Sequence, residues 1–201
     1  MRIRVGAASV VAVCLALATS VDGHGGPAQA APAFSDWVPV PLANGPNQVD
    51  IDGDGRQDLV FVAWRDNANA HGYELVTFYR RGPADDPTWE LVPFFDTKPA
   101  GEDSLHSIHG ADCQLRGIAV VRRTTSATEP ITVIVGDRDF GRSFADAAGV
   151  RFVVYAIARN VENTAGWPPV YFKAERTITS KSSYCDVNDA FAAELGIHTG
   201  R

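Results

Sequence analysis

The sequence lacks the motifs of the familiar serine and zinc hydrolases. No Ser stands three positions before a Lys, and Lys-Thr-Gly, Gly-x-Ser-x-Gly and His-x-x-x-His are all absent. Clustered positive charge is also missing, because the net charge is -6 and the basic residues occur singly or in pairs. A nucleic-acid-binding surface needs a basic stripe that neutralises phosphates. We therefore expect a protein that is not an enzyme and that has no nucleic-acid partner.

Long hydrophobic runs are scarce, and the run at the N-terminus is too short to span a bilayer. Two arginines precede this run, which covers residues 5–18, as in a signal peptide. Small residues that suit signal-peptide cleavage precede two points, after Ser20 and after Ala30. We therefore predict a signal peptide over residues 1–30, a periplasmic or secreted protein, and no membrane span.

Cysteine is rare, with three in the whole chain. Cys113 and Cys185 are the two that remain after cleavage. An exported protein meets an oxidising compartment, so we predict a disulfide between them. Such a bond would contribute about 4 kcal/mol in the chain-entropy model. The alternative is a pair of buried free thiols, and the spacing matches no zinc-ribbon pattern.

The remaining residues, 31–201, are about 170 in number and suit a single domain with a sizeable core. Short apolar runs alternate with turn sequences, and the chain has no internal repeat. Residues 59–64 are apolar at every position, which predicts a central strand covered on both faces. The fold class we predict is mainly β, a single-domain β-sandwich or open barrel with one short C-terminal helix. The expected strands are 37–42, 58–65, 73–80, 90–95, 114–122, 131–135, 151–158 and 170–179.

The expected helix lies near the C-terminus. Asp186 can cap its first turn, and Gly196 can end it. Between them, four apolar residues form one stripe at helical spacing: Val187, Ala190, Phe191 and Leu195. Cys185 immediately precedes the cap, so the predicted disulfide would fasten the helix to the sheet.

An Asp-Gly-rich loop, residues 50–58, carries carboxylates at its positions 1, 3, 5 and 9 and a glycine at position 6. Calcium prefers six to eight oxygen ligands at about 2.3–2.6 Å, and this spacing allows a tight turn to surround one ion. Position 12 is Phe61 and not the Glu of an EF-hand, so the loop enters a strand. The alternative is an ordinary solvated turn. We predict Ca²⁺ as a cofactor, with its ligand positions at Asp50, Asp52, Asp54, Arg56 and Asp58.

Two polar clusters follow this loop. Residues 64–72 form a connection between strands. Its guanidinium could pair with a ligand carboxylate, and its amides could form hydrogen bonds with polar groups of the ligand. A plain polar hairpin loop is the alternative. The second cluster, residues 106–113, holds His106 and His109, but no third ligand is evident and we expect no transition-metal site there. The predicted ligand-binding residues are Arg65, Asp66, Asn67, Asn69 and His71.

Four segments resemble the carbapenem intrinsic resistance proteins of the CarG type. They are residues 49–60 with Asp-Ile-Asp-Gly-Asp-Gly, 63–71 with Arg-Asp-Asn-Ala-Asn-Ala-His, 110–113 with Gly-Ala-Asp-Cys, and 184–191 with Tyr-Cys-Asp-Val-Asn-Asp-Ala-Phe. The resemblance covers roughly residues 45–196, in the same order. It implies a periplasmic protein that protects a producer from its own carbapenem by binding the drug without hydrolysing it.

Two functions therefore stay open from the sequence. The first is an exported CarG-like protein that confers intrinsic carbapenem resistance by non-hydrolytic binding or sequestration, with a β-lactam or another small molecule as ligand. The alternative is a calcium-stabilised envelope or adhesion module without a small-molecule ligand. The sequence leaves the oligomeric state open under either hypothesis.

Overall fold

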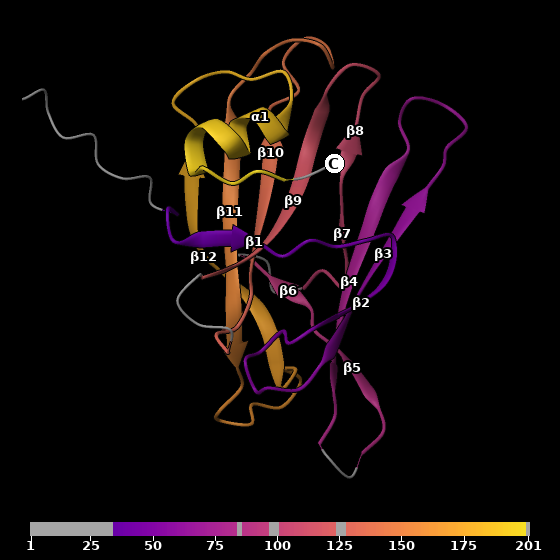
Figure 1. Ribbon diagram of the computed structural model, residues 1–201, viewed down its shortest axis with the longest axis vertical. Helices are drawn as coiled ribbons and strands as arrows, with labels where there is room; N and C mark the ends of the chain where they lie inside the picture. Colours follow the sequence, from indigo (N-terminus) through magenta and orange to yellow (C-terminus); the bar gives the residue numbers. More distant parts are fainter. Residues whose placement is uncertain (1–33, 84–85, 97–100, 124–127, 200–201) are drawn as a thin grey trace, which may run out of the picture. The chain divides into compact units, whose positions relative to one another are not determined.

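The computed structural model describes residues 34–83, 86–96, 101–123 and 128–199. Its strands form two separate hydrogen-bonded sheets that pack face to face, so the fold is a β-sandwich and not a barrel (Figure 1). The prediction of a mainly β fold with one short C-terminal helix is confirmed. The predicted signal peptide lies outside the described residues. Among those residues, no helix is both long and apolar enough to cross a membrane.

The larger sheet contains seven strands and runs in the order β1-β9-β10-β11-β12-β6, with β8 also paired to β9. Neighbours are antiparallel except β12 and β6, which are parallel. These strands are β1 (Trp37–Pro39), β6 (Phe94–Phe95), β8 (Ile108–His109), β9 (Gln114–Arg123), β10 (Thr132–Arg138), β11 (Val150–Arg159) and β12 (Val170–Thr179).

The smaller sheet contains five antiparallel strands in the order β2-β3-β4-β5, with β7 also paired to β4. Its centre is the β3–β4 hairpin, whose connecting loop carries the first predicted polar cluster. The strands are β2 (Gly45–Val49), β3 (Asp58–Arg65), β4 (Tyr73–Arg81), β5 (Trp89–Leu91) and β7 (Leu105–His106).

The main core lies between the two sheets and is built on three phenylalanines. Phe78 of the smaller sheet meets Phe94 and Phe172 of the larger one, and the last two rings stack with their centroids 4.4 Å apart. All three side chains are buried. Each such aromatic contributes about 1.5–3 kcal/mol through burial. This core joins the sheets into one body.

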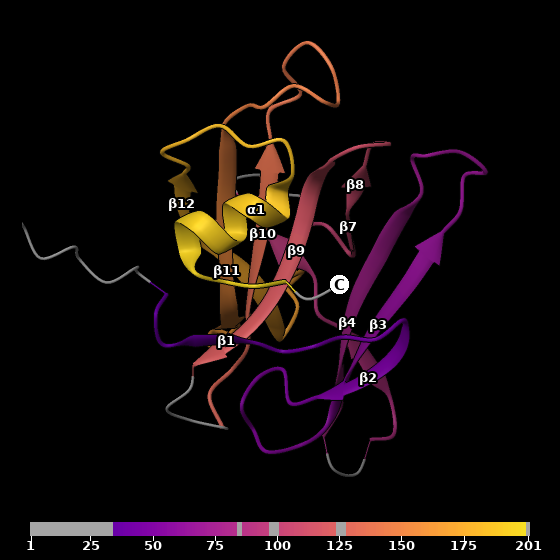
Figure 2. The same ribbon diagram turned by 45° about the horizontal axis from the view of Figure 1, so that its top comes forward.

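A second core lies on the other face of the larger sheet, under the C-terminal helix. Helix α1 (Val187–Ala190) continues as one π-helical segment, η1 (Phe191–Leu195), and crosses this face over β9 and β10 (Figures 1 and 2). The helix approaches closely because Gly117 and Gly136 stand below it. A Cβ at Gly136 would lie 2.8 Å from Cγ2 of Val187. The mid-strand glycines therefore make room for the helix.

The caps of this helix confirm the sequence prediction. The Asp186 carboxylate accepts a hydrogen bond from the backbone N–H of Asn188 at 2.8 Å. Gly196 ends the helical segment in the left-handed region, with φ 69°. The apolar stripe, from Val187 to Leu195, is buried as expected.

Several expectations about the strands are wrong: strand β1 ends at Pro39 and not at residue 42, and the two-residue strands β7 and β8 were not expected. Residues 90–95 are not one strand: Pro93, which has no N–H to donate, separates β5 in the smaller sheet from β6 in the larger. Strand β2 was not among the expected strands; it contains Pro46 and Asn47, which an edge position tolerates. Strand β3 is central in its sheet but covered on one face only, since the side chain of Phe61 is 41% exposed.

Candidate functional site

The aspartate loop, Asp50–Asp58, gathers three buried carboxylates. Asp50, Asp52 and Asp58 each offer an oxygen, and these three oxygens lie within 4.8 Å of one another. Oxygen atoms in such a cluster are the ligands that a hard cation such as Ca²⁺ prefers. The cluster is therefore able to hold a metal ion, which supports the predicted cation site in this loop.

Backbone N–H groups hold these carboxylates in place. Asp50 accepts from Gly53 at 2.8 Å and from Gly55 at 2.9 Å, while Asp58 accepts from Ile51 at 3.0 Å and from Arg81 at 2.9 Å. Each carboxylate oxygen has two lone pairs, so one accepted N–H leaves capacity for a cation. The loop is thus organised by its own backbone and by the N–H of Arg81 on β4.

Gly53 has a positive φ of 75°, and a Cβ there would lie 2.4 Å from the carbonyl oxygen of Thr128. The loop thus requires glycine at Gly53 for two reasons, its conformation and the neighbouring chain. Gly55, at the predicted turn position, also has a positive φ, of 82°, but the space around it is open.

The other two predicted metal positions lie differently. Asp54 is exposed, and its carboxylate accepts the backbone N–H of Arg56 at 2.8 Å. The Arg56 guanidinium reaches away from the carboxylates and donates to the carbonyl of Gly82 at 2.7 Å. Neither side chain joins the three-carboxylate cluster.

Two arginines from other strands face Asp52. The guanidinium of Arg159 lies 3.0 Å from Oδ2 of Asp52, and that of Arg80 lies 3.6 Å from the same oxygen. Arg159 also donates to the backbone carbonyl of Asp52 at 3.2 Å. Protein cations therefore balance part of the loop's negative charge, and a metal ion would share Asp52 with them.

The pKa of Asp58 is raised in this cluster of buried carboxylates. Burial raises the pKa of its carboxyl above the ordinary value, and the negative charges of Asp52 and Asp54 raise it further. The N–H groups of Arg81 and Ile51 oppose this shift without cancelling it. A positive charge bound at the cluster would favour ionised Asp58.

A second candidate site is a hollow of about 310 Å³ at the other end of β3. The sequence treats its residues as two separate clusters, but antiparallel pairing of β4 with β7 sets Leu75 opposite His106 and brings the clusters together. We call this site the histidine hollow. Its lining residues are His71, Tyr73, His106, Ser107, Ile108, His109 and Phe144.

Hydrogen bonds join the two polar clusters, residues 64–72 and 106–113, where they meet. Nδ1 of His71 lies 3.0 Å from the carbonyl oxygen of His109, and Nε2 of His109 lies 2.8 Å from Oγ of Ser107. Ser107 Oγ also accepts the backbone N–H of Glu74 at 2.8 Å. Its side chain is held from both sides, and the residue is 1% exposed.

The five predicted ligand-binding residues divide into two groups. His71 lines the hollow, and Arg65 donates to the hydroxyl of Tyr73 at 3.0 Å while its guanidinium stacks over the same ring. The other three shape the loop. Asp66 and Asn69 accept backbone N–H groups two residues ahead, and Asn67 donates to the carbonyl of His71 at 2.8 Å.

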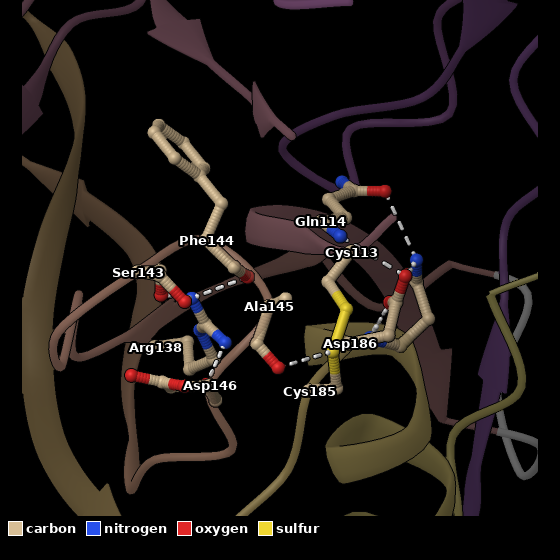
Figure 3. Close-up of a disulfide and its surroundings, with 10 residues drawn as sticks. Cys113, Gln114, Arg138, Ser143, Phe144, Ala145, Asp146, Cys185 and Asp186 are labelled. Carbon is tan, nitrogen blue, oxygen red and sulfur yellow. Dashed lines mark hydrogen bonds between the residues drawn. A yellow bond between two sulfur atoms is a disulfide. The ribbon is translucent and has the colours of Figure 1, made fainter. Parts of the chain in front are cut away.

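Sequence reasoning missed Phe144, whose ring packs on His71 with centroids 4.8 Å apart. Phe144 belongs to the β10–β11 connection, which buried Arg138 organises. Its guanidinium donates to the carbonyls of Asp146, Ser143 and Phe144, as Figure 3 shows. No periodicity marks Phe144 in the sequence. Its place follows from Arg138 and the fold.

The disulfide between Cys113 and Cys185 is present, which confirms that prediction (Figure 3). Its Cα atoms are 5.6 Å apart, and it joins the start of β9 to the residue before the helix cap. Asp186 reinforces the junction by accepting the N–H of Gln114 at 3.1 Å. Sγ of Cys185 lies 3.3 Å from the carbonyl oxygen of Ala145, beside Phe144. The bond thus supports the wall of the histidine hollow.

His106 differs from an ordinary surface histidine. Burial lowers its pKa, and the neighbouring positive charge of Arg116 lowers it further. Glu102 and Asp137 act in the opposite direction but more weakly. The lowered pKa favours the neutral imidazole of His106 at pH 7, which can donate or accept a hydrogen bond at the hollow.

Fold and sites together define a two-sheet β-sandwich with a disulfide-anchored C-terminal helix and an acidic loop that is able to hold a cation. A family model described as "Carbapenem resistance protein CarG-like" matches residues 42–193. This chain belongs to that CarG-like family.

A solved structure agrees with this assignment. The crystal structure of CarG matches with a TM-score of 0.66 and 21% sequence identity, covering 78% of this chain and 94% of the CarG chain. At this identity, the match establishes the shared fold alone. A comparison with curated protein sequences gives no match.

Proposed function

We propose that this protein is exported and protects the cell from a carbapenem by binding the drug without hydrolysing it. The observation that carries this proposal is the histidine hollow, which brings His71 of the first polar cluster and residues 106–109 of the second around one cavity. Membership of the CarG-like family supports the choice of ligand. The disulfide supports export, since such bonds persist in oxidising compartments.

The chemistry of the hollow suits a small anionic ligand. Its walls are mainly aromatic and aliphatic, from Tyr73, Ile108 and Phe144, with imidazoles as the polar groups. The guanidinium of Arg65 lies beside Tyr73 and is placed to pair with a carboxylate such as the one that carbapenems carry.

The same geometry supports binding over hydrolysis. Ser107 and His109 form a serine–histidine pair, but Ser107 is 1% exposed and its hydroxyl already accepts a backbone N–H. A nucleophile must reach the carbonyl that it attacks, and the burial of Ser107 leaves little access for this contact. We therefore propose that the protein is not an enzyme.

Resistance of living cells tests the proposal directly. A carbapenem-sensitive Gram-negative host that exports this protein should show a raised minimal inhibitory concentration, with the drug in the medium undiminished. Loss of the drug would mean hydrolysis. An unchanged inhibitory concentration at verified periplasmic expression would contradict protection and leave the calcium-stabilised envelope module as the better hypothesis.

Calorimetric titration of the purified protein with the same carbapenem tests the site. We expect Arg65→Ala and His71→Ala to weaken binding at least tenfold, a loss of about 1.4 kcal/mol. Arg81 and His198 are exposed residues outside the hollow, so Arg81→Ala and His198→Ala are the matched controls. Equal affinity in all four variants would place the ligand elsewhere.

We also propose that the aspartate loop holds Ca²⁺. The three clustered carboxylates and the raised pKa of Asp58 support this ion, because a bound cation would relieve their mutual repulsion. Calcium at 100 times its Kd should stabilise the fold by about 2.7 kcal/mol. This gain should disappear in Asp52→Asn. A melting temperature of the wild-type protein that calcium and chelator leave unchanged would mean that Arg80 and Arg159 neutralise the loop without an ion.

A further inference from the structure

A separate hollow of about 230 Å³ lies at the β11–β12 connection, residues 160–169. It adjoins the aspartate loop, because Arg159 at the end of β11 binds Asp52. Figure 1 shows this connection at the end of the sandwich opposite the β3–β4 loop. The hollow is therefore distinct from the histidine hollow. Its lining residues are Arg159, Asn160, Val161, Glu162, Thr164, Trp167 and Tyr171.

Aromatic rings form one side of this hollow. Trp167 packs on Phe95 with ring centroids 4.8 Å apart and planes inclined by 31°, and on Tyr171 with centroids 5.5 Å apart. Phe95 and Tyr171 also touch edge to face. Although its two neighbours support it, Trp167 remains 45% exposed. The Trp167 indole is thus held by its neighbours while it faces solvent at the edge of the hollow.

The connection is held in one conformation by its own side chains. Asn160 accepts the N–H of Thr164 at 2.9 Å and donates to the carbonyls of Thr164 and Trp167. Its backbone N–H donates to the carbonyl of Pro169 at 2.9 Å. A ligand would find the indole already positioned, which reduces the entropic cost of binding.

The polar groups of the hollow suit a ligand with many hydroxyls. Within the described part of the chain, no hydrogen bond engages the Trp167 indole N–H, the Tyr171 hydroxyl or the Thr164 hydroxyl. These groups can donate to, or exchange hydrogen bonds with, a polyol.

Charge at this hollow favours a neutral ligand over an anion. The guanidinium of Arg159 is committed to Asp52, at 3.0 Å from its carboxylate. Glu162 is exposed and contributes a negative charge. An anionic ligand such as a carbapenem would meet this carboxylate, while Arg159, the cation among the lining residues, already pairs with Asp52. A neutral molecule avoids that repulsion.

We propose that the β11–β12 hollow binds a pyranose unit of a neutral saccharide. The apolar C–H face of a sugar ring would lie on Trp167, while its hydroxyls exchange hydrogen bonds with Tyr171, Thr164 and Glu162. The hollow is smaller than usual pockets for drug-sized ligands, so it holds one ring of a longer glycan. This second activity is independent of the proposed carbapenem binding and would attach the protein to glycans of the cell envelope.

Saccharide titration of the full chain tests this proposal. Saturation-transfer NMR and calorimetry with chitotriose and with cellotriose should detect binding of at least one, with a Kd of about 1 mM or lower. Trp167→Ala should weaken it at least tenfold. Tyr171→Phe keeps the ring and removes one hydroxyl, so we expect about a fivefold loss.

Trp89 provides the matched control, because it is also 45% exposed and lies on β5 of the other sheet. Trp89→Ala should bind saccharide like the wild-type protein, and Trp167→Phe should retain part of the affinity. The proposal is overturned if neither trisaccharide binds at millimolar concentration. It is equally overturned if Trp167→Ala binds as the wild type does, or if Trp89→Ala loses as much affinity.

Discussion

The aspartate loop and the histidine hollow lie at opposite ends of strand β3, and their polar groups are satisfied in different ways. In the aspartate loop, nine consecutive residues supply the three clustered carboxylates, and each of the three accepts a backbone N–H group. The histidine hollow draws its walls from the β3–β4 loop and β4, from the segment that includes β7 and β8, and from the β10–β11 connection. One site is local in sequence, whereas the other depends on several long-range pairings.

Acid should act on the two ends in opposite directions. The folded pKa of Asp58 is raised, so lowering the pH through it relieves the cost of a buried charge. The folded pKa of His106 is lowered, so acid protonates this residue in the unfolded chain first and favours unfolding. The crowded carboxylates of the loop and the His106 imidazole beside Arg116 therefore respond in opposite directions to the same protons.

Removing the disulfide should have the largest effect on the free energy of unfolding. Its effect on binding should be confined to the histidine hollow. Cys113 and Cys185 are 72 residues apart, and opening a loop of this length costs about 4 kcal/mol in the chain-entropy model. We expect Cys113→Ala/Cys185→Ala to lose this amount of unfolding free energy in urea, and to lose ligand binding at the hollow. Calcium binding at the aspartate loop should survive at low temperature. Loss of both sites together would show that the two ends do not act separately.

Replacing Asp58 should lower the free energy of unfolding through the aspartate loop, by less than removal of the disulfide does. Both of its oxygens accept backbone N–H groups, from Ile51 and Arg81. In Asp58→Asn one of these N–H groups would face an amide donor, and an unsatisfied buried donor costs about 2 kcal/mol. Asp54→Asn is the control, because Asp54 is exposed, and it should stay within about 0.5 kcal/mol. Chemical denaturation measures both, and equal losses would contradict the difference in burial.

The titration of His106 should give the smallest effect and sharpen the contrast in pH response. Its stability contribution is constant well above pH 6.5, the ordinary pKa of histidine. As the pH falls below that value, the unfolded chain gains a proton before the folded protein does, so stability declines until the folded pKa is passed. Denaturation midpoints from pH 8 to pH 5 measure this decline, and His106→Asn should flatten it. A wild-type profile that matches the variant would place His106 in ordinary surroundings.

Several parts of the fold could be predicted because their signals are local. Strands β3 and β12 have the bounds expected from their sequences, and the helix begins and ends at the predicted Asp186 and Gly196. The division of residues 90–95 between two sheets could not be predicted in the same way. A strand's apolar pattern identifies a buried face, but it does not identify which sheet the strand joins.

The candidate sites follow the same rule. The sequence identified the aspartates because the spacing of one short loop already implies their convergence. It named His71 and the His106–His109 pair as well, but in separate clusters. Their meeting depends on the register of β4 against β7, and Phe144 joins them only because Arg138 binds the carbonyls around it.

By itself, the sequence determined the β-rich class, the disulfide partners, the capped helix and the loop that gathers the carboxylates. Each of these depends on neighbours in the chain or, for the cysteines, on the expected removal of the third cysteine with the signal peptide. The tertiary structure alone decided that the three histidines share one cavity, that Arg80 and Arg159 balance Asp52, and that Trp167 rests on Phe95. These contacts join residues far apart in the chain. Sheet pairing and core packing bring them together, and no local pattern encodes either one.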